Sequence, residues 1–482
     1  MVGKGRGSLQ AWEARMDLTN LDWSSARDGL LRKTFSCEEY VGELVAVAER
    51  LTTLHGWVEF DSAALLTKAR EADQSGVATD PQRRLGGLPL GVKDNIDVVG
   101  MRCSAGTGAL AQRRPKRDAQ VITYLKDEGA FVAGKTVLHE LAMGATSNNA
   151  VTGAARNPYD ASRSPGGSSG GSGTVVGARM VPVALGTDTG GSVRVPAALC
   201  GIAGLRPTTG RYPGRGVLPL SHTRDTVGPL ARSVADLALL DEIITQDNAW
   251  PHVELSGLRV GVPRDIFTRD VDPAIGALFE GFVSELGRLG VHLIEAELPE
   301  RDEINGQIGF PIVLFETEQE LLGVLAEEGN PITLQALYDG IGSPDVAAIV
   351  RQQLGPDKIT PSAYAQALRR RNRLQSLYAE HYRQHGLDAM IFPTCPLTAP
   401  RIEDDVTVKL NGRDVPTFLA YIRHTDPGSV AGLPGISIPL GLVDGLPVGL
   451  ALEGTPHTDR FLLALSQRFE QMLPRIDPPG FA

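Results

Sequence analysis

The chain has few cysteines and no long apolar run. Its 482 residues include 4 cysteines, which lie far apart and form no Cys-x-x-Cys pair. This spacing argues against a disulfide framework or a zinc site and favours a reducing cytosol. No apolar stretch approaches the 18 or so residues that a membrane-spanning helix needs. Residues 1–15 carry basic side chains without an apolar core, so we expect no secretory signal and a cytoplasmic location.

Positive charge is also scarce. The chain has 47 basic and 57 acidic side chains, which gives a net charge of −10. Clustered lysine and arginine residues supply most of the affinity for nucleic acids and anionic membranes. We therefore expect neither nucleic acid nor a membrane as a partner. Hydrophobic residues at 42% and charged residues at 22% are typical of a globular protein.

Glycine, by contrast, is abundant. The chain has 55 glycines, well above the roughly 7% that is average. The richest segment, residues 164–173, reads Ser-Pro-Gly-Gly-Ser-Ser-Gly-Gly-Ser-Gly and by itself resembles a flexible linker. However, apolar sequence follows directly, and a second Gly–Ser turn, residues 186–192, comes soon after. This recurrence inside apolar sequence favours two functional turns over a linker.

The two glycine-rich turns are predicted to meet. Residues 170–178 are long enough for two helical turns, about 12 Å, and Met180–Leu185 is long enough for one strand, about 17–20 Å. A helix followed by a returning strand brings Ser168 and Ser192 to the same edge of a sheet. Small residues at that edge let backbone amides approach a substrate closely.

Alternating strands and helices define the expected fold class. Leu88–Val92 and residues 131–133 read as strands, and Asp118 is expected to cap a helix between them. Ser36 and Glu39 form a capping box that opens an N-terminal helix. The pattern favours an α/β fold with a central, mixed, twisted sheet surrounded by helices.

Residues from about 250 to 390 differ in composition. They carry more charge and fewer glycines, and residues 274–289 and 361–385 read as long helices. We expect a helical cap or insertion here. Glycine and proline return afterwards, which suggests that the C-terminal segment rejoins the same sheet. We therefore expect an N-terminal helical segment at 1–60 and a single discontinuous domain at 61–482.

Two other hydrolase patterns match the sequence only weakly. Residues 166–170 fit the G-x-S-x-G nucleophile elbow, but a glycine-rich stretch matches that pattern easily. The histidines that it would need, His222, His424 and His457, have no distinctive context. His381 and His385 share one helix face without the glutamate of H-E-x-x-H, so we expect a solvated helix end and no metal site.

Three motifs in order identify a family. Residues 91–95 read Gly-Val-Lys-Asp-Asn, residues 166–171 read Gly-Gly-Ser-Ser-Gly-Gly, and residues 186–194 read Gly-Thr-Asp-Thr-Gly-Gly-Ser-Val-Arg. In this order and spacing the chain resembles the amidase signature family, strongly over residues 60–245 and more loosely over 388–460. The resemblance implies a Ser–cis-Ser–Lys triad on a mixed sheet surrounded by helices, with no cofactor.

The resemblance also implies a role for each motif residue. Ser192 would be the nucleophile, Ser168 the bridging serine on a cis peptide, and Lys93 the base. A serine hydroxyl is a weak nucleophile until a base takes its proton, and lysine needs a pKa shift of about 3 units to be neutral at pH 7. Burial of Lys93 at the end of its strand could supply part of that shift.

Other residues are expected to support this triad. Ser169 would hold it through hydrogen bonds, and Asp188 and Arg194 would form a structural ion pair around the turn. The backbone N–H groups of the turn could form an oxyanion hole. Its expected members are Thr189, Gly190, Gly191 and Ser192.

The substrate is expected to be a small amide. Residues 208–212 and 221–225 look most like those of bacterial amidases of the indoleacetamide and mandelamide hydrolase type. An aryl or arylalkyl amide fits best, because the helical insertion can wall a large apolar pocket. The expected lining residues are Ala142, Met143, Gly144 and Arg211, and a plain core role for Met143 stays open.

Several alternatives remain open at this point. The same triad can cleave esters and carbamates, since all pass through a tetrahedral oxyanion, so a urethanase is a second candidate. A glutamyl-tRNA amidotransferase A subunit is disfavoured, because Val195 stands where that subunit typically has glutamine. A binding scaffold without activity is disfavoured because Lys93, Ser168 and Ser192 are all present. A homodimer is compatible with the sequence.

Overall fold

A single large sheet organises the molecule. The computed structural model describes residues 17–480, so the expectation for residues 1–15 lies outside the described residues. The sheet has 11 strands in the order β1-β3-β2-β4-β6-β5-β12-β13-β9-β7-β8, and a separate hairpin joins β10 and β11. The strands are β1 (Trp57–Phe60), β2 (Pro89–Lys93), β3 (Phe131–Thr136), β4 (Val183–Asp188), β5 (Ala203–Arg206), β6 (Thr226–Ala231), β7 (Arg259–Gly261), β8 (His292–Ile294), β9 (Ala389–Pro393), β10 (Thr407–Leu410), β11 (Arg413–Pro416), β12 (Gly435–Val443) and β13 (Leu446–Glu453).

The sheet is mixed, as the sequence predicts. Strand β2 runs parallel to β3 and β4, and β7 runs parallel to β8 and β9. The remaining pairs in the sheet are antiparallel. Strands β2 and β4 are buried along their whole length, which explains why they read as near-continuous apolar runs.

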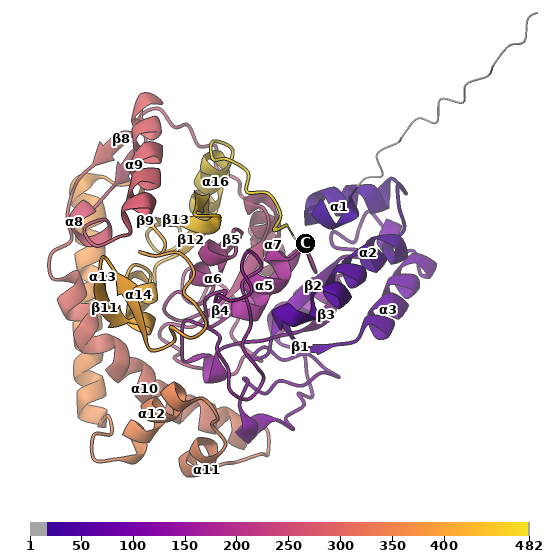
Figure 1. Ribbon diagram of the computed structural model, residues 1–482, viewed down its shortest axis with the longest axis horizontal. Coiled ribbons are helices and arrows are strands. Elements are labelled where there is room, and N and C mark those ends of the chain that lie inside the picture. Colours follow the sequence, from indigo (N-terminus) through magenta and orange to yellow (C-terminus); the bar gives the residue numbers. More distant parts are fainter. Residues whose placement is uncertain (1–16, 481–482) are drawn as a thin grey trace, which may run out of the picture.

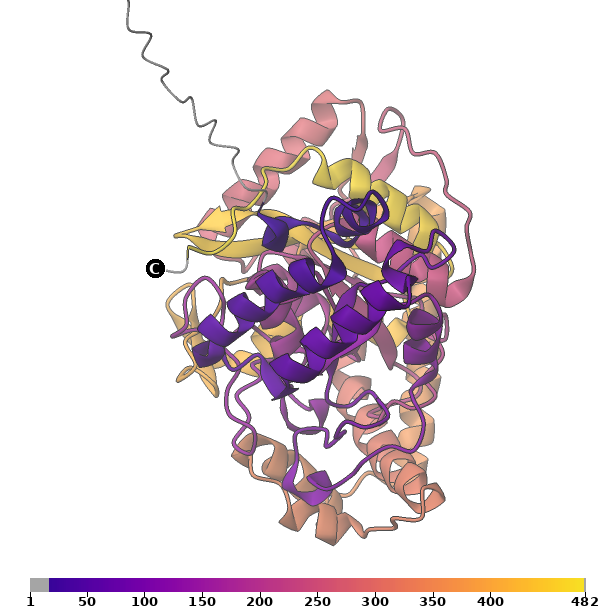
Figure 2. The same cartoon turned by 90° about the vertical axis from the view of Figure 1, so that its right-hand side faces the viewer.

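Helices surround the sheet on all sides in the two views (Figures 1 and 2). They are α1 (Trp23–Leu31), α2 (Cys37–Arg50), α3 (Ser62–Gln74), α4 (Gln120–Asp127), α5 (Gly170–Gly177), α6 (Arg194–Leu199), α7 (Val234–Thr245), α8 (Arg264–Phe267), α9 (Pro273–Arg288), α10 (Arg301–Glu327), α11 (Leu334–Asp339), α12 (Pro344–Leu354), α13 (Pro361–His385), α14 (Thr417–Ile422), α15 (Asp426–Ala431) and α16 (Asp459–Glu470). Across residues 17–480, no helix combines the length and the apolar character that a bilayer crossing demands.

Several local predictions are confirmed. The capping box at Ser36 and Glu39 opens α2. Helix α13 covers residues 361–385, and α9 lies within one residue of its predicted bounds. The strand expected at Leu88–Val92 is β2, shifted by one residue, which places Lys93 at its end.

Two local predictions are wrong. Asp118 does not cap α4, because its carboxylate accepts the Val99 N–H at 2.7 Å and pairs with Lys126. His381 does not lie at a solvated helix end. Its side chain is buried, and burial lowers the pKa of its imidazole to about 4.

The segment at 250–390, predicted to be a helical cap or insertion, also contains strands. In Figure 1, α11 and α12 lie at the bottom of the molecule and α13 runs along its left side, but the same segment also supplies β7 and β8, which extend the sheet at one edge. Strands of only three residues leave too short a pattern to be read against the long helices around them.

Candidate active site

The site lies where two parallel strands end at the same edge of the sheet. Strand β2 ends at Lys93 and its parallel neighbour β4 ends at Asp188. Their register pairs Val92 with Leu185, so the lysine side chain reaches the last residues of β4. The carboxyl ends of neighbouring parallel strands commonly carry binding sites.

Lys93 is fully buried and hydrogen-bonded. Its Nζ lies 2.8 Å from the Ser168 hydroxyl and 2.7 Å from the Thr187 hydroxyl. Burial lowers the pKa of Lys93 to about 7, against a smaller opposing effect of Asp188 and Asp225. The lysine can therefore be neutral at ordinary pH and accept a proton from Ser168.

Two consecutive serines connect Lys93 to the turn after β4. The peptide bond between Gly167 and Ser168 is cis. The next residue, Ser169, donates its N–H to the Ser192 carbonyl at 3.1 Å and its hydroxyl to the Thr187 carbonyl at 3.1 Å. The helix α5 and strand β4 thus bring the two glycine-rich turns together, as their lengths predicted.

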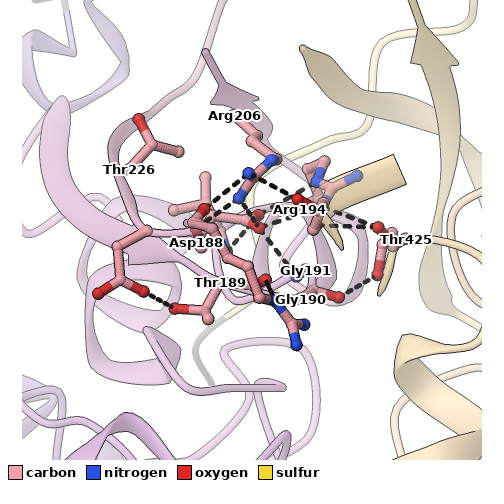
Figure 3. A network of polar contacts seen from close by, with 12 residues as sticks. Asp188, Thr189, Gly190, Gly191, Arg194, Arg206, Thr226 and Thr425 are labelled. Atoms are coloured by element: carbon pink, nitrogen blue, oxygen red, sulfur yellow. Dashed lines mark hydrogen bonds and ion pairs between the residues drawn. The ribbon is translucent and has the colours of Figure 1, made fainter. Parts of the chain in front are cut away.

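Asp188 holds the turn from inside (Figure 3). Its carboxylate accepts the Gly191 N–H at 2.9 Å and pairs with Arg194 at 3.0 Å and Arg206 at 3.2 Å. Burial alone would raise the pKa of Asp188, but the two guanidinium groups hold it well below its usual range. Gly191 has a φ of +133°, and a Cβ there would lie 2.2 Å from the Thr425 hydroxyl. Only glycine fits this position.

The hydrogen bonds of the turn narrow the expected set of oxyanion donors. The Gly191 N–H is already donated to Asp188 and is not available to a substrate, which corrects its place in the predicted set. Among the residues that the structure describes, the N–H groups of Thr189, Gly190 and Ser192 have no hydrogen-bond acceptor. These three remain the donors that a developing oxyanion could use.

A cavity of about 390 Å³ opens beside Ser192. Thr189, Gly190 and Ser192 of the turn line it. Its walls are mostly apolar and come largely from the loop at 142–144, helix α10 and helix α14. Leu220 and Arg224 of the loop before β6, Ile349 of α12 and Asp426 of α15 also line it. The lining residues include Ala142, Met143, Gly144, Phe310, Val313, Leu314, Phe418, Leu419 and Ile422.

Arg211 does not line this cavity, in contrast to its predicted place. Its guanidinium is bonded to Asp241 at 2.7 Å and to Asp247 at 3.1 Å. Its position in a loop signals exposure, but those two carboxylates lie 30 or more residues away in the sequence. No local pattern could have paired them.

Two residues at the centre of the site are not predicted from the sequence. Arg206 is fully buried at the end of β5 and pairs with Asp188. Thr187, the last residue but one of β4, holds Lys93 and also accepts the Asn95 side-chain N–H at 3.1 Å. An arginine that closes a short apolar strand was the available signal for Arg206.

One group in residues 17–480 has the composition of a metal site. His222, Glu316 and Glu320 bring ligand atoms within 4.8 Å of one another. The Tyr364 and Ser221 hydroxyls donate to Glu316 at 2.7 Å and 2.5 Å, and His222 is bonded to Glu320. These hydrogen bonds explain the grouping, so it carries no metal assignment.

Comparison with known proteins places this geometry in context. The family model described as Amidase matches residues 39–463. An indoleacetamide hydrolase of Rhizobium radiobacter is 40% identical over 447 residues, which cover 92% of this chain and 95% of that protein. A mandelamide hydrolase of Pseudomonas putida is 39% identical over 446 residues, which cover 88% and 86%.

Solved structures of amidases are also similar to this chain. A crystal structure of an amidase superposes with a TM-score of 0.85 at 31% identity, over 94% of this chain and 100% of that one. The peptide amidase from Stenotrophomonas maltophilia superposes with a TM-score of 0.80 at 28% identity, over 96% and 99%.

Proposed function

The chain belongs to the amidase signature family and is an amide hydrolase, and from that premise we propose that it cleaves small aryl or arylalkyl amides with Ser192 as nucleophile. The observation that carries this proposal is the contact between the fully buried Lys93 and the Ser168 hydroxyl, 2.8 Å apart. Ser168 would relay the proton between Ser192 and Lys93.

The first half of the reaction forms an acyl-enzyme. Ser192 Oγ attacks the amide carbon while its proton passes to Ser168, whose own proton passes to Lys93. The carbonyl oxygen gains negative charge and is stabilised by the free N–H groups of the turn. When the tetrahedral intermediate collapses, the proton returns through Ser168 to the leaving nitrogen, and the C–N bond breaks.

The second half releases the acid. Water attacks the ester carbon and gives up a proton through Ser168 to Lys93. The ester bond to Ser192 then breaks, and the proton returns to the serine oxygen. At the end of the cycle Ser192, Ser168 and Lys93 have returned to their starting protonation states.

The cavity supports the substrate class. Its apolar walls on α10 and α14 suit an aromatic ring, and Gly144 and Ser192 line the same cavity. The relatives named indoleacetamide hydrolase and mandelamide hydrolase carry substrate names of the same type. The proposed cycle consumes only the amide and water.

Two measurements test this proposal together. A fluorophosphonate probe should label Ser192 in the folded wild-type chain and should not label the S192A variant. A panel of an arylacetamide, an aryl amide, a long-chain amide, an aromatic carbamate and an ester should give the highest kcat/KM for an arylacetamide or aryl amide. An unlabelled but folded wild type, or a preference for the carbamate or the ester, would overturn it.

A further inference from the structure

Two consecutive residues hold Thr189, the first residue of the turn after β4. The Arg224 Nε–H donates to the Thr189 carbonyl at 3.1 Å. The Thr189 hydroxyl in turn donates to Asp225 Oδ1 at 2.6 Å. Both partners come from the loop before β6, which pairs with β4 in the sheet. Thr189 is therefore fixed at its backbone and at its side chain from one neighbouring segment.

Holding a carbonyl also sets the direction of the next N–H. The Thr189 carbonyl and the Gly190 N–H belong to one planar trans peptide and point to opposite sides of it. Gly190 has no side chain to fix this plane, and within residues 17–480 its own carbonyl accepts a hydrogen bond from the Thr425 hydroxyl alone, at 2.7 Å. The contact from Arg224 therefore decides where the Gly190 N–H points.

Arg224 is itself anchored at two further places. Its guanidinium donates to the Gly309 carbonyl of α10 at 3.1 Å and pairs with Asp426 at the start of α15. Asn305 donates to the second oxygen of Asp426 at 2.7 Å. The Arg224 side chain is nearly fully buried. A buried, planar group with donors in a fixed geometry is a rigid support.

We propose that Arg224 is a positioning residue of this amidase, which aligns the Gly190 N–H with the oxyanion of the transition state. The proposal rests on the proposed function, because it needs an oxyanion beside Ser192. Arg224 also lines the cavity beside Ser192, together with Gly309 and Asp426. Among residues 17–480, however, its side chain is hydrogen-bonded to Thr189, Gly309 and Asp426 and not to Ser192 or Lys93. It acts through the peptide plane between Thr189 and Gly190.

The conservative variant separates alignment from charge. In R224K a lysine ammonium can still neutralise Asp426, but it lacks the planar guanidinium that bonds Thr189, Gly309 and Asp426 together. A misplacement of about 1 Å can cost on the order of 100-fold in rate. We expect kcat to fall by about 10- to 100-fold in R224K, while KM for an arylacetamide changes by less than about threefold.

The affinity for a transition-state analogue distinguishes loss of oxyanion alignment from a general structural defect. An arylalkyl boronic acid adds to a serine oxygen and forms a tetrahedral anion, which resembles the intermediate and requires the oxyanion donors. The boronate should bind R224K more weakly than wild type, by the same factor as the loss in kcat. The Kd of the neutral amide, measured in the inactive S192A variant and in the S192A/R224K double variant, should differ by less than about threefold.

A second buried arginine supplies the matched control. Arg113 pairs with Asp97 at 2.7 Å and with Glu328 just beyond α10, and has no contact to the turn. R113K should lower the melting temperature as much as R224K and leave boronate affinity unchanged. The double variant R224Q/D426N removes both charges of the buried pair. This double variant replaces R224K in the test if R224K does not fold, and it should show the same weakened boronate binding.

The outcomes distinguish this inference from the function that it rests on. If R224K or the double variant is folded and binds the boronate like wild type, the inference is overturned while the amidase proposal stands. If R113K loses boronate affinity to the same degree, the effect is general destabilisation and the inference is again overturned. If the wild type itself is neither labelled by a fluorophosphonate nor bound by the boronate, the proposed function fails first.

Discussion

At the scale of single residues, Lys93 sets the pH at which the proposed reaction begins. Burial lowers its pKa to about 7. Below that pH the amine is protonated and cannot take a proton from Ser168, so kcat/KM should fall tenfold per pH unit. Above it the amine is neutral, and kcat/KM should level off. A profile from pH 5 to 10 measures this inflection, and a flat profile would contradict a lysine base.

A pair of lysine variants assigns the inflection. Lys135 is also fully buried, and it donates to the Ile96 carbonyl at 2.6 Å and to the Arg102 carbonyl at 3.0 Å. K93R replaces the amine with a group that stays charged in this range, so it should remove nearly all activity between pH 5 and 10. K135R should keep the inflection near 7 if the protein folds.

The bridging serine gives a second test at this scale. S168A removes the hydroxyl that receives the Lys93 contact at 2.8 Å. Loss of a positioned proton relay typically costs about 10²- to 10⁴-fold, so kcat should fall by that factor while KM stays within about threefold. Ser172 is a buried serine on α5 whose hydroxyl donates to Leu185, and S172A should keep most of the activity. Equal losses in both variants would argue against a relay through Ser168.

At the scale of elements, two helices are expected to select which acyl groups fit the cavity. Phe310 on α10 and Phe418 on α14 lie with ring centroids 6.1 Å apart and line the cavity together. Phe310 is 41% exposed, so its removal should leave stability nearly unchanged. F310A should raise KM for arylacetamides about tenfold and leave that for acetamide unchanged.

The control variant for F310A changes an exposed apolar residue on another element. Leu442 on β12 is 45% exposed and does not line the cavity. L442A should leave both KM values unchanged. The ratio of KM for the arylacetamide to KM for acetamide is the quantity to compare. If F310A raises both values equally, the two helices do not select the acyl group.

The elements also show how far local sequence patterns reach. Helix α13, the capping box of α2 and the meeting of the two glycine-rich turns could be predicted, because each depends on residues close in sequence. Arg206 and the partners of Arg211 could not, because their contacts join segments far apart in the chain. Strand β7 pairs with β9, more than a hundred residues later, so its three residues carried no readable signal.

At the scale of the whole molecule, the sheet combines both halves of the chain. Strand β5 pairs with β12, which places Leu205 opposite Ile436. Arg194, two residues after Ser192, donates to the Ser429 hydroxyl at 2.6 Å. The active-site turn in the first half is therefore supported by residues of the second half. This pairing is the physical basis for proposing one discontinuous domain over residues 61–482.

Cutting the chain between these halves tests that proposal. His252 lies in the link between α7 and β7, and its side chain is 84% exposed. A protease site inserted beside it should be cleaved without unfolding, because the link contributes no strand to the sheet. The two fragments should then co-elute in gel filtration and keep most of the amidase activity, since the backbone pairing of β5 with β12 and the buried contacts of Arg194 remain.

The uncut protein with the same insertion is the control. Fragments that separate in native buffer and lose activity would mean two domains joined only by the chain. Fragments that stay together would show that the second half holds the catalytic turn in place through the sheet.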